Sequence, residues 1–278
     1  MIGNAISAAG ESRFTRDMLK HRLASAVIGA PLIILLAWLG GGWTIALVAA
    51  AASIGLIEFH RLSYREGATP QLFLGVVAVV LFAVEAAVEF DFARPLLVGA
   101  FIAPLLLLIV LPQKERLLTD WAWTIAGVLL IGWTLSHAVL LRALSDGREW
   151  LLFLIVLTFA IDTGAYTVGR LAGRRPMAPT ISPGKTWEGA FGALAAGIGV
   201  SVALVSIYDL GIGVWDSIIV GGLIGFFSQA GDLALSLVKR AAGVKNASGL
   251  IPGHGGILDR LDSLILAVLV LYYFLQYR

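Results

Sequence analysis

The side chains best suited to chemistry gather in one polar segment near the C-terminal end of the sequence. Asp232, Ser236 and Lys239 are spaced by four and three residues, so a helix would place them within about 60° on one face. Asp259 and Asp262 follow a glycine-rich stretch and are one helical turn apart. Carboxylates in a chain without cysteine suit Mg²⁺, which proteins bind through one or two carboxylates together with substrate phosphates. The segment therefore favours phosphate chemistry with Mg²⁺ as the cofactor.

Ion-paired helix ends are the structural alternative for the same charges. That alternative accounts for Lys239, Arg240 and Arg260. It explains neither the glycines between the two groups of aspartates nor an aspartate as deep in an apolar run as Asp232. Glycine lets a backbone approach a ligand closely, so ligand binding explains the segment better.

A second polar segment, residues 170–187, is basic and rich in small residues. Ser182 followed by Pro183 resembles a helix start, with Ser at the N-cap and Pro at the first helical position, which would aim backbone amides at an anion. Lys185 and the adjacent arginines then suit a phosphate, and Glu188 is a carboxylate that can orient them.

The tripeptide Gly184-Lys185-Thr186 invites comparison with a nucleotide-binding P-loop. That motif needs a further glycine at the place of Pro179 and a strand before the loop, and the sequence supplies neither. We therefore exclude a P-loop and expect a loop that binds phosphate in another way.

Asp162, Tyr166 and Arg170 recur at intervals of four residues, within about 80° on one helical face. Ionisable groups inside apolar segments are costly, so each is a candidate for function or for a structural pair. An internal network from Asp162 to Arg170 is the structural alternative here. For Glu58 we expect an ion pair with Arg61, and for His137 a hydrogen-bonded packing role.

Composition determines what kind of elements position these side chains. Hydrophobic residues make up 59% of the chain and charged residues only 14%, against about 25% charged in soluble domains. The apolar residues form runs long enough for a helix to cross roughly 30 Å of hydrocarbon, without the alternation of a membrane barrel. We expect an all-α integral membrane protein, a polytopic bundle of about nine transmembrane helices. The expected spans are residues 23–40, 43–59, 71–89, 95–111, 120–141, 150–169, 188–208, 214–238 and 261–277.

Basic residues orient this bundle, because they are retained on the cytoplasmic side. With a cytoplasmic N-terminus, every Lys and Arg falls on that side except Arg94, Arg142, Arg148 and Arg278. The polar segment 1–22 does not read as a cleaved signal, and residues 1–278 are expected to form a single membrane domain. The loops 170–187 and 239–260 would then share the cytoplasmic face of a catalytic region spanning residues 160–265.

At these residues the chain resembles the phosphatidate cytidylyltransferase, or CDP-diacylglycerol synthase, family. The family pattern combines S-x-x-K-R-x4-K-D with H-G-G-x-x-D-R-x-D. The DTGAY segment from Asp162, the SPxKTWEG pattern from Ser182 and the pair Gly231-Asp232 match as well. Asn246 departs from the pattern's Asp, and Leu235 stands where many members carry Glu. The residues in register are Ser236, Lys239, Arg240, Lys245, His254, Gly255, Gly256, Asp259, Arg260 and Asp262.

The resemblance implies attack by the phosphate of phosphatidic acid on the α-phosphorus of CTP, giving CDP-diacylglycerol and pyrophosphate for phospholipid biosynthesis. It implies Mg²⁺ at Asp232, Asp259 and Asp262, with Lys239 and His254 completing the catalytic set. His254 would donate a hydrogen bond to pyrophosphate. The residues expected to bind substrate or phosphate are Asp162, Tyr166, Arg170, Ser182, Lys185, Thr186, Glu188, Ser236, Arg240, Lys245, Gly255, Gly256 and Arg260.

Three alternatives remain beside this hypothesis. Loss of two carboxylates at Asn246 and Leu235 would fit a catalytically impaired paralogue. An ion-coupled transporter would need charges near mid-membrane in two related halves, and no such halves are visible. A CDP-alcohol phosphatidyltransferase would need paired D-G-x2-A-R and G-x3-D-x3-D elements, which are absent.

We expect a multi-pass protein of the cytoplasmic (inner) membrane with its site facing the cytoplasm and no nucleic-acid partner. The family resemblance is also compatible with a homodimer.

Overall fold

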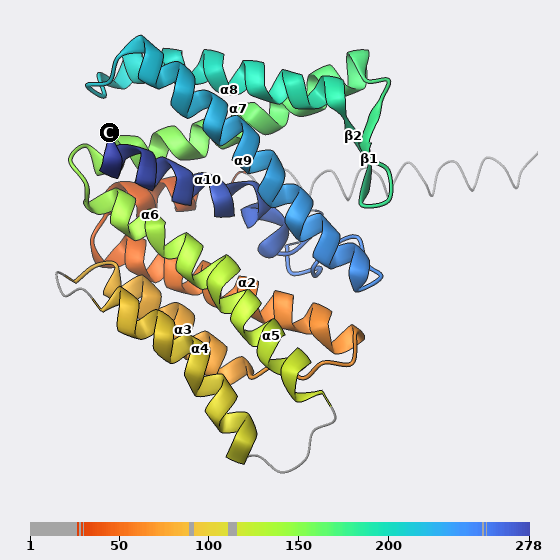
Figure 1. Cartoon of the computed structure of the whole chain (residues 1–278). Helices are drawn as coiled ribbons and strands as arrows, with labels where there is room; N and C mark the ends of the chain where they lie inside the picture. The colour runs from red at the N-terminus through yellow and green to blue at the C-terminus, as the bar shows by residue number, and fades with distance from the viewer. Residues whose placement is uncertain are drawn as a thin grey trace, which may run out of the picture.

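Apolar helices make up nearly all of the computed structural model, which describes residues 27, 29, 31–88, 92–110, 116–251, 253 and 255–278 (Figure 1). The N-terminal segment 1–22 and His254 lie outside the described residues. Residues 31–39 are helical and belong to the first expected span. The remaining elements are α2 (Gly42–Arg65), α3 (Leu72–Glu85), α4 (Ala93–Val110), α5 (Leu117–Gly127), the π-helix η1 (Val128–Trp133), α6 (Thr134–Ala143), α7 (Gly147–Ala172), β1 (Pro176–Ala178), β2 (Ser182–Thr186), α8 (Trp187–Tyr208), α9 (Val214–Ala241) and α10 (Leu258–Tyr277).

Six of the described helices are long and apolar enough to cross a membrane. They are α2, α4, the continuous helix Leu117–Ala143 that contains α5, η1 and α6, and α7, α8 and α9. The apolar helix α3 is shorter, with 14 residues. The expectation of a multi-pass, nearly all-α membrane protein is thus confirmed, and the count of nine spans stays a prediction.

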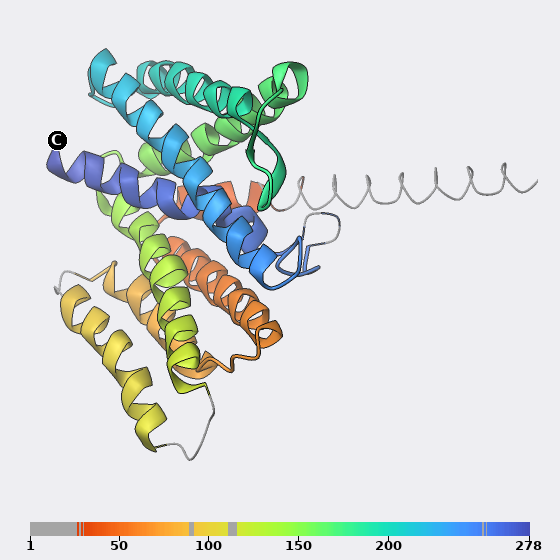
Figure 2. The same cartoon turned by 45° about the vertical axis from the view of Figure 1, so that its right-hand side comes forward.

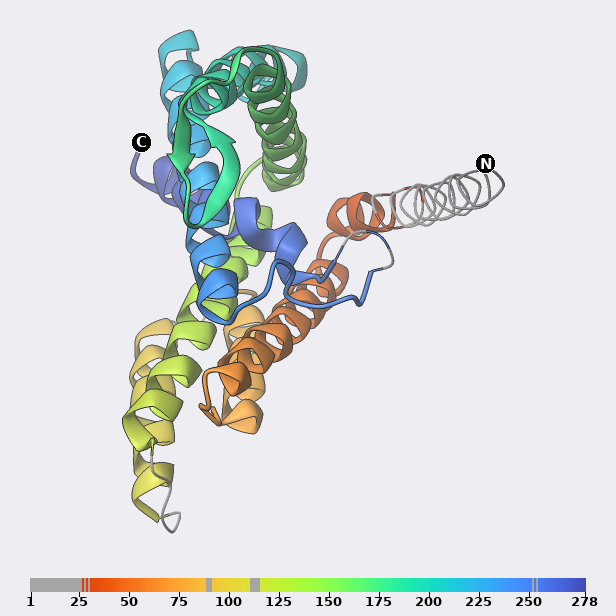
Figure 3. The same ribbon diagram turned by 90° about the vertical axis from the view of Figure 1, so that its right-hand side faces the viewer.

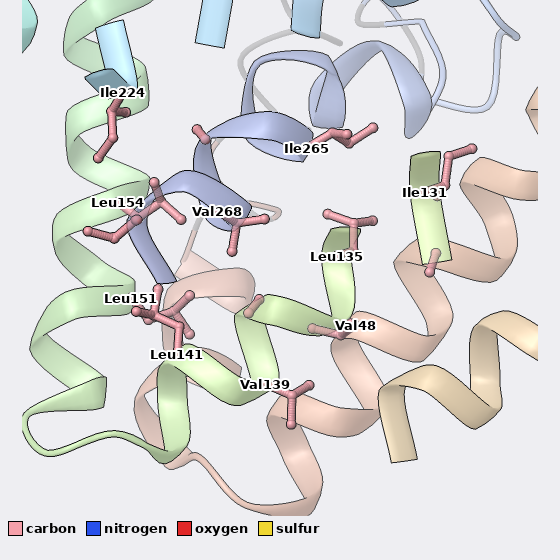
Figure 4. Close-up of a cluster of buried hydrophobic side chains, with 14 of the residues drawn as sticks. Val48, Ile131, Leu135, Val139, Leu141, Leu151, Leu154, Ile224, Ile265 and Val268 are labelled. Atoms are coloured by element: carbon pink, nitrogen blue, oxygen red, sulfur yellow. The ribbon is translucent and has the colours of Figure 1, made fainter. Parts of the chain in front are cut away.

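The helices form two groups with α10 between them (Figures 1 and 2). On one side, α7 packs against α8 and α8 against α9. On the other side lie α2 to α6, and α10 contacts both α9 and α6. Figure 4 shows the apolar side chains that join the groups, among them Leu135 from α6, Leu154 from α7, Ile224 from α9 and Val268 from α10. Their burial fixes the position of α10, which carries Asp259 and Asp262.

The π-helix η1 interrupts the helix Leu117–Ala143 one turn before His137. His137 Nδ1 lies 2.8 Å from the carbonyl oxygen of Trp133, and its ring packs edge-on against the rings of Trp133 and Tyr272. The expected packing role of this histidine is therefore confirmed.

The expected helix start at Ser182 and Pro183 is wrong. These residues belong to β2, which pairs antiparallel with β1, and the next helix begins only at Trp187. Thr186 has an extended backbone and is the N-cap, since its hydroxyl accepts the Gly189 N–H at 3.1 Å. A proline is compatible with a strand of this kind because a two-stranded hairpin has only edge strands.

The β1–β2 hairpin and the residues after α9 lie at one end of the molecule, and the C-terminus lies at the other (Figures 1 and 2). Figure 3 views the molecule from the hairpin end. The Arg240 side chain at the end of α9 joins the two segments, donating a 3.0 Å hydrogen bond to the Ile181 carbonyl in the turn of the hairpin. The two polar segments of the sequence are therefore neighbours in space.

Glycines at the contact between α8 and α9 allow the two helices to approach closely. A Cβ on Gly197 would lie 2.7 Å from the Gly221 carbonyl oxygen, whereas a Cβ on Gly199, in the same helix, would meet nothing within 4 Å. We expect Gly197→Ala to destabilise the protein by about 1–3 kcal/mol through overpacking. Gly199→Ala should be neutral or slightly stabilising, because Ala is the better helix former. Thermal unfolding in detergent compares the two variants, and equal melting temperatures would contradict the packing described here.

Candidate active site

The side chain of Lys185 connects the hairpin to α9. Its Nζ lies 2.8 Å from Oδ2 of Asp232, with both side chains partly exposed. The other oxygen of Asp232 accepts a 3.1 Å hydrogen bond from the Ser236 hydroxyl one helical turn later. The predicted helical face of Asp232 and Ser236 is confirmed, and the hairpin supplies its cation.

Lys239 lies one turn further along α9 and is buried, with 6% of the residue exposed. Its Nζ lies 2.7 Å from Oδ1 of Asp259 and 3.6 Å from Oδ2 of Asp262, both on the first turns of α10. A buried ammonium is costly unless it is paired and hydrogen-bonded, so this contact ties the end of α9 to the start of α10.

Asp259 also holds the glycine-rich loop. Its Oδ2 accepts hydrogen bonds of 2.9 Å from the backbone N–H groups of Ala247 and Gly256. A Cβ on Gly255 would lie 2.7 Å from the same oxygen, and Gly255 has φ of +85°, a conformation that favours glycine. Both features require glycine at position 255, as the family pattern has it.

Asp162 of α7 completes the group of acidic side chains. Its two carboxylate oxygens lie 3.2 and 3.3 Å from the Ser263 hydroxyl on α10. Asp162 is also close enough to Asp232, Lys185 and Arg260 to interact with them electrostatically, and Asp262 interacts in the same way with Asp232 and Asp162. Side chains from α7, β2, α9 and α10 thus converge on one site.

Not every predicted residue reaches this site. Arg170 donates a 2.9 Å hydrogen bond to the Tyr166 hydroxyl, and Tyr166 is 65% exposed, so the pair lies on the outside of α7. The expected alternative, a network from Asp162 to Arg170, is wrong, because Arg170 pairs with Tyr166 and Asp162 with Ser263. Lys245 is exposed, and Arg260 is exposed although it is close enough to Asp162 to interact with it. Glu188 accepts the backbone N–H groups of Arg174 and Arg175. The carboxylate of Glu188 therefore orients the start of the hairpin.

The expected ion pair of Glu58, in α2, is wrong. Glu58 is buried and does not pair with Arg61, which is exposed. Instead it accepts hydrogen bonds from the backbone N–H groups of Ile257 and Leu258 at the start of α10. A carboxylate within an apolar run is a usable signal of such a role, but the sequence does not name its partner.

The carboxylates are donors of the type that Mg²⁺ prefers, although their partners in the structure include lysines and backbone N–H groups. Four carboxyl groups, those of Asp162, Asp232, Asp259 and Asp262, face the two lysine ammonium groups of the site and the nearby Arg260. Among the described residues no three acidic or histidine side chains form a ready metal cluster. Of these four carboxylates, Asp259 accepts the most hydrogen bonds, with three donors on its two oxygens. Asp232 is the most exposed of the three expected metal ligands.

Comparison with known proteins shows the family of this chain. The model of the cytidylyltransferase family matches residues 20–278. A phosphatidate cytidylyltransferase of Brucella suis is 33% identical over 266 residues, which cover 92% of this chain and 93% of the relative. One from Staphylococcus haemolyticus is 32% identical over 250 residues, covering 88% and 94%. A third, from Staphylococcus epidermidis, is 37% identical over 154 residues, covering 55% and 58%. The chain therefore belongs to the cytidylyltransferase family.

Proposed function

We propose that this protein is a phosphatidate cytidylyltransferase, which transfers a cytidylyl group from CTP to phosphatidic acid and releases pyrophosphate. The observation that carries the proposal is the buried Lys239 between Asp259 and Asp262, next to the Lys185–Asp232 pair. Lysine side chains stabilise the charge on a transferring phosphoryl group, and carboxylates beside them can hold a metal ion for the same purpose. The family and the names of its relatives support the substrates.

Catalysis of this kind depends on alignment and charge neutralisation. An oxygen of the phosphatidate phosphate forms a bond to the α-phosphorus of CTP while the bond to pyrophosphate breaks. Lys185 and Lys239 supply positive charge to the triphosphate, and Arg240 and Lys245 extend it toward the exposed side. No general base is needed, because a phosphate monoester is already largely ionised near neutral pH.

Magnesium would be held by Asp232 and Asp262, with Asp259 as the third carboxylate. When bound, the ion supplies charge neutralisation for the transferring and leaving phosphate groups. Asp259 contributes a second function of its own, since it fixes Ala247 and Gly256 through their N–H groups. Asp162 would act through Ser263, which it holds by hydrogen bonds at the start of α10.

The proposed setting is the cytoplasmic (inner) membrane, with nine spans, a cytoplasmic N-terminus and the site facing the cytoplasm, where CTP is available. The distribution of Lys and Arg supports this orientation. The hairpin and the loop after α9 lie at the same end of the molecule, as that orientation requires (Figure 3). A lipid substrate would then reach the site from the inner leaflet.

The purified protein in detergent should convert CTP and phosphatidic acid to CDP-diacylglycerol only with a divalent metal. Asp232→Asn should lower the rate at least about 100-fold, because it removes a ligand and the partner of Lys185. Asp259→Ala should abolish turnover as well. Asp209→Asn is the matched control, since Asp209 is exposed at the far end of α8 and Asn tolerates its left-handed backbone. Full activity of Asp232→Asn, or metal-independent turnover, would refute the metal assignment.

Asn246→Asp tests the alternative of an impaired paralogue. Asn246 is exposed, so a carboxylate at this position would remain solvated. Interactions between exposed charges are worth up to about 1 kcal/mol, which corresponds to a change in kcat/KM of less than about fivefold. Steady-state kinetics with CTP as the varied substrate measures the change, and a rise of tenfold or more would support impairment of the native chain.

A further inference from the structure

Glu58 lies in α2, far in sequence from the site, yet its carboxylate contacts the loop that leads into α10. Its Oε1 accepts the Ser248 hydroxyl at 2.5 Å and the Ile257 N–H at 3.2 Å, and its Oε2 accepts the Leu258 N–H at 2.7 Å. Glu58 is 2% exposed. A buried carboxylate with three donors is held in one position.

These contacts stabilise the beginning of α10. Ile257 is the N-cap and Leu258 the first helical residue, so their N–H groups have no partner within the helix. A negative charge at a helix N-terminus is further stabilised by the helix dipole. Glu58 thus does for α10 what a capping side chain does for other helices, but from a separate helix.

Gly256 is enclosed between two carboxylates. On one side its N–H donates to Asp259 at 2.9 Å, and on the other a Cβ would clash with both oxygens of Glu58. Position 256 must therefore be glycine because Glu58 is there. The contact is connected to Lys239 through Asp259, which binds both Gly256 and Lys239.

We propose that Glu58 is a positioning residue of the active site. It fixes the described residues 248 and 256–258, and through them it orients Asp259 and Asp262 toward Lys239. It contacts backbone and Ser248, not the reacting groups. The proposal rests on the proposed function for its effect on turnover, but the ordering of the loop is independent of that function.

Glu58→Ala should lower kcat by about 10- to 100-fold, as loss of a supporting contact does in other sites. The kcat of Glu58→Gln should lie between those of Glu58→Ala and the wild type, because one of the two acceptor oxygens is replaced by a donor. Glu66→Gln is the matched control: it removes the same charge from the end of the same helix, where Glu66 is exposed. Far-ultraviolet circular dichroism checks that the helical content is unchanged.

Trypsin cleavage after Lys245, followed by mass spectrometry, measures the order of the loop without any substrate. We expect Glu58→Ala to accelerate this cleavage at least about fivefold, and Glu66→Gln to leave it unchanged. If the wild type makes no CDP-diacylglycerol while Glu58→Ala still accelerates cleavage, the proposed function fails and the ordering role of Glu58 stands. Wild-type kcat together with wild-type cleavage in Glu58→Ala would overturn the proposal.

A double-mutant cycle separates this contact from general destabilisation. Gly256→Ala should accelerate the cleavage strongly in the wild type, where the added methyl meets Glu58, and much less in the Glu58→Ala background, where that space is free. Equal effects of Gly256→Ala in both backgrounds would overturn the coupling between the two residues.

Discussion

The contact of the Lys239 ammonium with Asp259 and Asp262 is the interaction on which the rest of the site depends. It is buried, and it joins the end of α9 to the start of α10 across the loop between them. Lys239 and Asp259 are 20 positions apart in the sequence. Removing one partner of such a pair would leave a buried charge unpaired, which costs several kcal/mol. A cation held in this way is already desolvated, and under the proposed function it would contact a substrate phosphate.

The fold surrounds this contact with supports from distant parts of the chain. Apolar packing places α10 between the two groups of helices, and glycines allow α7, α8 and α9 to pack closely. The hairpin brings Lys185 to Asp232, and α2 brings Glu58 to the N-terminus of α10. Residues from the first half of the sequence are therefore part of the site's structure, although the family pattern lies in the second half.

Spacing within a helix was enough to predict the shared face of Asp232, Ser236 and Lys239, because helical geometry is local. Contacts between elements were not predictable in this way. The helix expected from Ser182 is a strand, since its pairing with β1 outweighs the local signal of Ser before Pro. Glu58 and Leu258 are 200 residues apart, so nothing in the local sequence could reveal their hydrogen bond. Hydropathy correctly predicted that the protein has several long apolar helices, because a membrane span depends on the composition of its own segment rather than on a partner.

Metal binding measured without turnover tests the central claim most directly. Mn²⁺ can replace Mg²⁺ at oxygen ligands, and its free concentration can be followed by electron paramagnetic resonance in a titration of the purified protein with and without CTP. We predict that CTP tightens Mn²⁺ binding and that Asp262→Asn, which removes a carboxylate beside Lys239, weakens it at least about tenfold. Identical Mn²⁺ binding by the variant and the wild type would contradict the account.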